Sequence, residues 1–157
     1  MQKITPFLWF DDQAEQAAKF YVSIFKRSKI LSTTHYGDSG MGQPGKVMTV
    51  TFRLEGQKFV ALNGGPHYKL TPAFSLFVSC KDQREVDYFW KKLAKGGQEL
   101  RCGWVTDKFG VSWQIIPDAL PELLGDDDAE KSGRVMQAML KMVKLDVKKL
   151  KQAHAGK

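Results

Sequence analysis

The chain has 157 residues, of which 43% are hydrophobic and 26% are charged, a composition typical of a globular protein. No apolar run approaches the roughly 20 residues of a membrane span, and the first residues lack the pattern of a secretory signal. Its two cysteines, Cys80 and Cys102, do not make a disulfide framework. We therefore expect a cytoplasmic protein with free thiols and no membrane partner.

The net charge of +7 is concentrated in one part of the chain. Residues 134–157 carry seven basic groups and one acidic group, whereas residues 1–133 are nearly neutral. This basic segment has no aromatic residue, and single-stranded nucleic-acid sites usually combine basic groups with aromatic stacking platforms. The charge pattern predicts a solvated helix face and no nucleic-acid partner.

The first predicted elements are a strand over about residues 3–10 and an amphipathic helix that runs to Lys26. Apolar side chains recur along the helix at the spacing of one helical face. Asp11 or Asp12 is expected to cap the helix, because a short acidic side chain can accept its free N–H groups.

Two further strand regions are expected before the middle of the chain. Residues 29–36 are predicted to form a strand, and residues 37–46, with four glycines and a proline, a loop. Residues 46–63 alternate apolar and polar side chains and turn at Glu55-Gly56, which predicts a β-hairpin.

The second half begins after a predicted linker over residues 64–72. A strand over 73–80 and a helix over 82–95 follow, and Gly96-Gly97 ends the helix. Short strands near 98–106 and 111–117 complete this half.

The tail is predicted to form a short helical turn at DALPELLG and then one amphipathic helix over about 128–154. Its apolar face is rich in methionine, which packs adaptably. This face either packs on its own domain or forms a dimer contact. It contains Val135, Met136, Met139, Met142, Val143, Val147 and Leu150.

Residues 4–26 and 73–95 have the same order of strand, turn and helix. The matching pairs are Asp12-Gln13 with Asp82-Gln83, and Phe20-Tyr21 with Phe89-Trp90. This repeat predicts two similar modules with a cleft between them, a common place for a small-molecule site.

The predicted fold class is α+β: two βαβββ modules forming cupped mixed sheets, plus a C-terminal amphipathic helix. The expected domains are 3–63 and 73–117 for the modules, and 118–157 for the helical extension.

Several segments resemble the vicinal oxygen chelate (glyoxalase/bleomycin resistance/dioxygenase) superfamily. They are ITPFLWF, ALNGGP, FSLFVSC, EVDYFW and CGWVTDKFGVSWQIIP. The set is most similar to the PhnB-like branch, which often carries the label 3-demethylubiquinone-9 3-methyltransferase, and GRVMQAMLKMVKLD in the tail also resembles it. The resemblance implies a small-molecule ligand and a homodimer.

In metal-dependent members of this superfamily, His, Gln or Glu side chains on the sheet floor hold a divalent cation. The matching positions here are Thr5, Ser75, Gln114 and either Val60 or Leu62, without a carboxylate or an imidazole. Hydroxyl and amide groups bind Zn²⁺ or Ni²⁺ poorly. We therefore predict no cofactor and no tightly bound metal, and leave weak divalent binding open. Thr5, Ser75 and Gln114 either hydrogen-bond a neutral ligand or satisfy one another.

Other candidate ligand-binding residues belong to two groups. Asn63 and His67 follow the hairpin at the expected cleft edge. Four aromatic residues either line an apolar pocket or belong to the core: Phe7, Trp9, Trp104 and Trp113. No catalytic residue is assigned.

Three functions remain open. The first is metal-independent binding of a small organic molecule in the cleft between the sheets. The second is an enzyme of the superfamily with an unidentified substrate: a lyase, an isomerase, a dioxygenase, or the methyltransferase of the label. The third is a structural or interaction role of the C-terminal helix. Methyl transfer lacks sequence support, because the glycines at 37–45 precede a strand and not the helix of a cofactor-binding turn.

Overall fold

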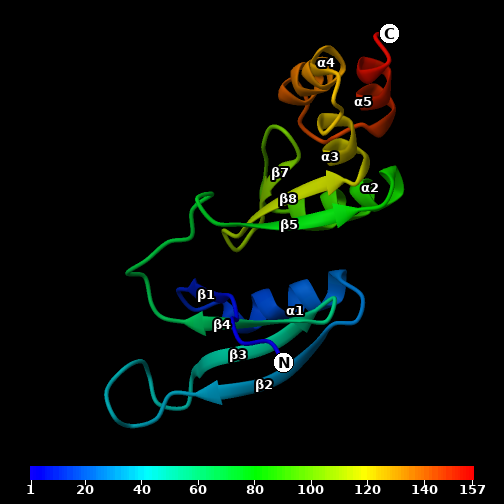
Figure 1. Cartoon of the computed structure of the whole chain (residues 1–157). Coiled ribbons are helices and arrows are strands. Elements are labelled where there is room, and N and C mark those ends of the chain that lie inside the picture. The colour runs from blue at the N-terminus through cyan, green and yellow to red at the C-terminus, as the bar shows by residue number, and fades with distance from the viewer. The chain divides into compact units, whose positions relative to one another are not determined.

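The computed structural model describes all residues from 1 to 157. The chain divides into two compact units, Met1–Leu70 and Thr71–Lys157, whose elements can be followed in Figure 1. Each unit contains a four-stranded mixed sheet, which confirms the predicted α+β class. No helix is both long enough and apolar enough to cross a membrane.

The first unit has the predicted order of strand, helix and three strands. Its sheet runs in the order β1-β4-β3-β2, with β1 parallel to β4 and the other neighbours antiparallel. The elements are β1 (Phe7–Phe10), α1 (Ala14–Ile24), β2 (Lys29–His35), β3 (Val47–Leu54) and β4 (Gln57–Asn63).

Helix α1 packs against one face of this sheet. Alternating side chains of the strands point to that face, among them Leu8, Phe52 and Ala61, all at most 2% exposed. Tyr21 on α1 is fully buried and its ring centre lies 6.1 Å from that of Phe52. The opposite face carries Phe7, which is 59% exposed.

The predicted cap of α1 by Asp11 or Asp12 is wrong. The residue at the cap position, Gln13, makes no side-chain cap bond. Instead, the Oδ1 atom of Asn63, at the end of β4, accepts the Ala14 N–H at 2.8 Å. A side chain from a distant strand thus satisfies a free donor at the start of the helix.

The second unit repeats the topology of the first. Its sheet runs in the order β5-β8-β7-β6, again with its first two neighbours parallel and the rest antiparallel. This shared order confirms the repeat at the level of topology. The elements are β5 (Ser75–Cys80), α2 (Gln83–Ala94), β6 (Gln98–Glu99), β7 (Trp104–Thr106) and β8 (Ser112–Pro117).

The strand predicted near 98–106 is interrupted between β6 and β7. Cys102 and Gly103 both adopt positive φ, 61° and 82°, so the chain turns there. At Gly103 a Cβ atom would lie 3.0 Å from the carbonyl oxygen of Ile115, a close approach that explains glycine at this position.

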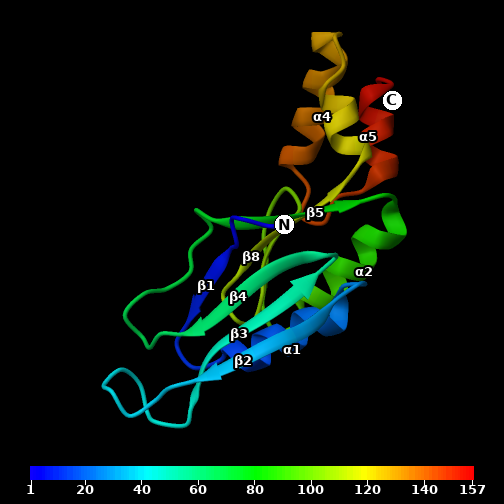
Figure 2. The same ribbon diagram turned by 60° about the horizontal axis from the view of Figure 1, so that its bottom comes forward.

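The tail contains three helices: α3 (Ala119–Leu124), α4 (Ala129–Leu140) and α5 (Val147–His154). Figure 1 labels all three, and Figure 2 labels α4 and α5, which contact each other. The prediction of one helix over 128–154 is wrong. The carbonyls of Met142 and Val143 accept the N–H groups of Cys102 and Gly103 at 2.9 and 2.8 Å, so this segment bonds to the turn before β7. Asp146 then caps α5 by accepting the Lys149 N–H.

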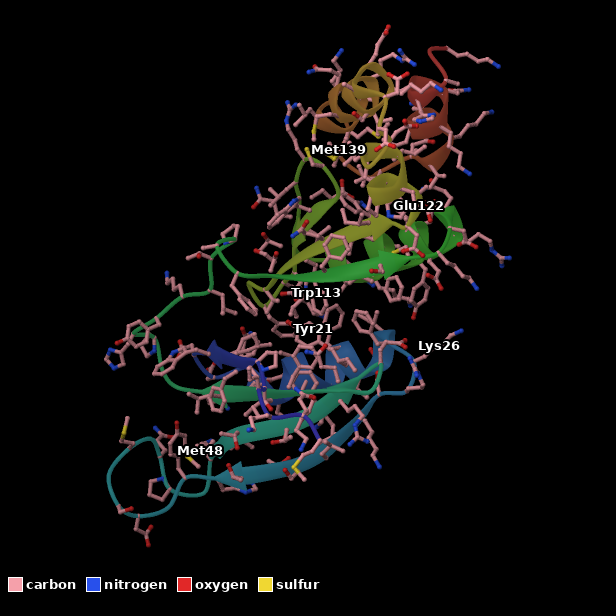
Figure 3. The ribbon with its side chains drawn as sticks, viewed as in Figure 1. Tyr21, Lys26, Met48, Trp113, Glu122 and Met139 are labelled. Atoms are coloured by element: carbon pink, nitrogen blue, oxygen red, sulfur yellow. The ribbon has the colours of Figure 1, made fainter.

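These helices have a small core of their own in the second unit. Ile116, Leu120, Val135, Leu145 and Leu150 are buried together, and Met139 (labelled on α4 in Figure 3) and Met142 pack against them. Part of the predicted apolar face therefore packs on its own domain. Met136 on α4 and Val143 in the connection to α5 remain 39% and 44% exposed.

A buried carboxylate organises the turn between β7 and β8. Asp107 is 3% exposed and accepts the backbone N–H groups of Phe109 and Val111 at 2.8 and 3.1 Å. It also accepts the indole N–H of Trp113 at 2.8 Å. Three donors therefore depend on one side chain.

We expect Asp107→Ala to lower the free energy of unfolding by about 3 kcal/mol, because three hydrogen bonds to a charged, buried acceptor are lost. Urea denaturation followed by circular dichroism measures this change. Asp38→Ala, at an exposed loop carboxylate, is the control and should change it by less than about 0.5 kcal/mol. Equal effects of the two substitutions would contradict the role of Asp107.

Candidate functional site

The first unit contains a hollow of about 910 Å³. It is bounded by the end of β1, the first turn of α1, residues 36–47 between β2 and β3, and residues 63–67 after β4. Strands β1 and β4 are parallel, so their carboxyl ends meet at this edge. Ligands of α/β sheets commonly bind at such ends.

Trp9 forms one wall of the hollow. Its indole N–H donates to the carbonyl of Gly65 at 2.9 Å, and its ring meets the edge of Tyr68 with 5.0 Å between ring centres. A Cβ atom on Gly64 would lie 2.3 Å from the Trp9 ring. The glycine thus allows the chain after β4 to lie directly against the indole.

Asn63 connects the segments around the hollow. Besides capping α1, its Nδ2 donates to the carbonyl of Val47 at 3.1 Å, and the hydroxyl of Tyr36 donates to its backbone carbonyl. The Asn63 amide was predicted to bind ligand. The structure places it at the hollow, with its side chain engaged in holding the frame.

The loop over 37–46 folds back on Tyr36. The Tyr36 N–H donates to the carbonyl of Lys46 at 2.8 Å, and the Gly45 N–H donates to the carbonyl of Tyr36 at 2.9 Å. A Cβ atom on Gly42 would lie 2.6 Å from the Tyr36 ring. Tyr36 was missed in the sequence, although its position directly before a glycine-rich loop was a usable signal.

Acidic groups outnumber basic ones around the hollow. Asp11, Asp12 and Glu15 line it together with one cation, Lys46. Glu15 pairs with Lys19 outside the hollow at 3.4 Å, whereas the carboxylates of Asp11 and Asp12 make no ion pair or side-chain hydrogen bond. They lie at the start of α1, where the helix dipole favours negative charge.

The remaining candidates in the first unit lie elsewhere or at its rim. His67 is exposed and belongs to the lining of the hollow. Phe7 lies on the open face of the sheet, opposite Val60, and Thr5 precedes β1. Trp9, Asn63 and His67 are therefore the predicted residues that the hollow brings together.

In the second unit, Ser75 and Gln114 satisfy each other. The Gln114 Nε2 donates to the Ser75 hydroxyl at 3.0 Å, and Trp104 lies opposite Gln114 in the register of β7 and β8. Beside them, the Ser112 hydroxyl is buried without a hydrogen-bond partner. These residues form a polar patch on the sheet.

Trp113 is a core residue, which is one of the two alternatives that the sequence leaves open for it. It is 2% exposed and belongs to the face of the sheet that includes Val105 and Ile115. Its indole N–H donates to the Asp107 carboxylate; Figure 3 labels Trp113. Because successive side chains of a strand point to opposite faces of the sheet, Trp113 lies on the face opposite to Gln114.

The side chains do not fit a transition-metal site, and the buried Cys80 thiol does not fit a nucleophile. No group of three or more His, Cys, Asp or Glu side chains could hold a metal ion. The hydroxyl and amide groups of Thr5, Ser75 and Gln114 are weak donors for such a metal. Burial raises the pKa of the Cys80 thiol to about 12, so this thiol is inert at neutral pH.

We expect Gly64→Ala to displace Trp9, because the added methyl group would overlap the indole ring. The substitution should cost about 2 kcal/mol of unfolding free energy and shift the tryptophan emission. Gly37→Ala is the matched control, since a Cβ atom at Gly37 meets nothing within 4 Å. Unchanged emission and stability in Gly64→Ala would contradict the close approach.

Solved structures of three bacterial proteins are similar to this chain. The PhnB protein of Bacillus cereus is 40% identical over 74% of this chain and 99% of its own, with a TM-score of 0.68. A protein of Staphylococcus aureus is 38% identical over 73% of this chain and 94% of its own, with a TM-score of 0.34. A Pseudomonas aeruginosa protein, 20% identical over 74% of this chain and 98% of its own, has a TM-score of 0.63.

No match was found among proteins with curated functions. The model of the family described as 3-demethylubiquinone-9 3-methyltransferase matches residues 2–116. Helices α3, α4 and α5 lie outside this match. The match therefore does not support the resemblance of the tail segment GRVMQAMLKMVKLD to the family. Because the match extends over most of the chain and into both units, the chain belongs to the PhnB-like, glyoxalase-fold family of that description.

Proposed function

We propose that this protein binds a small organic molecule without a tightly bound metal, and that the hollow of the first unit contributes to its binding. The size of the hollow carries the proposal: about 910 Å³ lies in the range of small-molecule pockets. The cleft between the modules stays a prediction from the sequence.

The character of the lining supports an organic ligand. Trp9 and Tyr36 offer aromatic surface, and Asp11, Asp12 and Lys46 offer charges at the rim. Because the Asn63 hydrogen bonds hold the frame, little ordering of the backbone would be needed on binding, which favours affinity.

The donor set argues for metal-independent binding. The positions that hold the cation in metal-dependent relatives are occupied here by Thr5, Ser75, Gln114 and an aliphatic residue. The hollow of the first unit is lined by Asp11, Asp12 and Glu15. These three carboxylates do not form a cluster that could hold a metal ion.

The family description names a methyltransferase, and the fold of this chain does not favour that chemistry. The glycine-rich segment 37–46 joins two antiparallel strands, β2 and β3. A nucleotide-type cofactor is usually held by a glycine turn between a strand and a helix, whose N-terminus faces the cofactor.

Ligand binding can be tested with three probes that share one ring: tryptamine, indole and indole-3-acetate. We expect shifts of the Trp9 indole and Gly65 amide signals in ¹H–¹⁵N spectra. They should be largest for cationic tryptamine, because acidic groups dominate the rim. The Trp9→Ala variant has no Trp9 indole signal, so its readout is the amide signals around Asn63. These signals should no longer shift when a probe is added. Trp104→Ala, in the other unit, is the control.

Two results would contradict this proposal. Absence of saturable shifts with all three probes would remove the hollow as a binding site. Equal loss of binding in Trp9→Ala and Trp104→Ala would place the response outside the hollow.

We expect purified protein to contain far less than one equivalent of Mn, Fe, Ni or Zn, because hydroxyl and amide ligands hold such ions weakly. Elemental analysis and native mass spectrometry after metal addition measure this. A stoichiometric shift of one metal per chain would overturn the metal-independent proposal, and Gln114→Ala would then identify the ligand.

A homodimer is also part of the proposal. Each sheet has one face away from its helix, and these faces expose Phe7 (59%) and Phe77 (56%). Large exposed aromatic groups often mark interaction surfaces. The native mass spectrum reports the oligomeric state directly.

A further inference from the structure

The C-terminal helices create a second hollow, within the second unit. It has a volume of about 540 Å³ and lies between α2, the connection from α4 to α5, and the first turn of α5. The family match ends at residue 116, so α4 and α5 supply features that the matched region does not contain.

Four lysines surround this hollow: Lys141, Lys144, Lys148 and Lys149. The ammonium of Lys144 pairs with Asp87 at 2.8 Å. The other three ammonium groups make no ion pair or hydrogen bond in the structure. They are therefore free to meet a ligand.

The two carboxylates in the lining are already engaged. Asp87 accepts from Lys144 and from Gln83, and these bonds, that of Lys144 first, lower its pKa below the ordinary value. Asp146 accepts the Lys149 N–H at 3.0 Å and caps α5. The lining thus remains positively charged overall.

Gln83 fixes the position of the lysine-bearing segment. Its Oε1 accepts the Val147 N–H at 2.7 Å, and its Nε2 donates to the carbonyl of Leu145 at 3.0 Å. The bond from the Cys102 N–H to the Met142 carbonyl holds the other end of the connection. The lysines therefore project from a backbone held at several points.

We propose that this hollow binds a small, multiply charged anion of the phosphate type. Ammonium groups bind phosphoryl oxygens as point charges. The concave shape fits a compact anion, and the aromatic platforms that single-stranded nucleic acid would use are absent from its lining. This site is independent of the hollow in the first unit.

Calorimetric titration with inorganic pyrophosphate at constant ionic strength tests the site. We expect one pyrophosphate per chain, and about tenfold weaker binding in Lys148→Gln/Lys149→Gln, because two ammonium contacts are lost. Lys151→Gln/Lys157→Gln removes the same charge outside the hollow and should change affinity by less than about twofold.

A gain of affinity provides the second test. Asp87→Asn removes a negative charge and releases Lys144, so pyrophosphate should bind about threefold more tightly. A misfolded variant could not produce this result. No saturable binding, equal losses in both lysine pairs, or unchanged or weaker binding in Asp87→Asn would each overturn the proposal.

Discussion

The amide of Asn63 is the interaction on which the first unit's site depends. One side chain at the end of β4 caps α1 and bonds to the start of β3, while its own carbonyl accepts from Tyr36. These bonds hold three separate segments around one hollow. The site is thereby framed by backbone groups in fixed positions, the kind of preorganisation that makes a binding site effective.

The two copies of the module have diverged at this same point. In the register of the sheets, Asn63 lies opposite Phe10, and the corresponding position in the second unit is Pro117, opposite Cys80. Helix α2 is capped locally instead, by Asp82. In the first unit, the end of β4 borders the hollow. In the second unit, the end of β8 at Pro117 leads directly into α3 and the helical extension.

The two hollows also differ in charge. Acidic side chains dominate the rim in the first unit, and lysines dominate the lining in the second. The rim of the first hollow is therefore negatively charged, although the whole chain has a net charge of +7. The distribution suits ligands of opposite charge at the two sites, because nearby charges set the local potential more than the net charge does.

The sequence by itself determined the two modules, because the alternation of strands and the periodicity of helices are local properties. It also identified Trp9, Asn63 and His67 as candidate site residues. The tertiary structure decided the cap of α1, whose partners are 49 residues apart, and the break between α4 and α5, where Cys102 and Gly103 bond to Met142 and Val143. It also decided that Trp113 is buried. Trp113 and Gln114 are adjacent in the chain, but the strand places their side chains on opposite faces, and only packing fixes which face is covered.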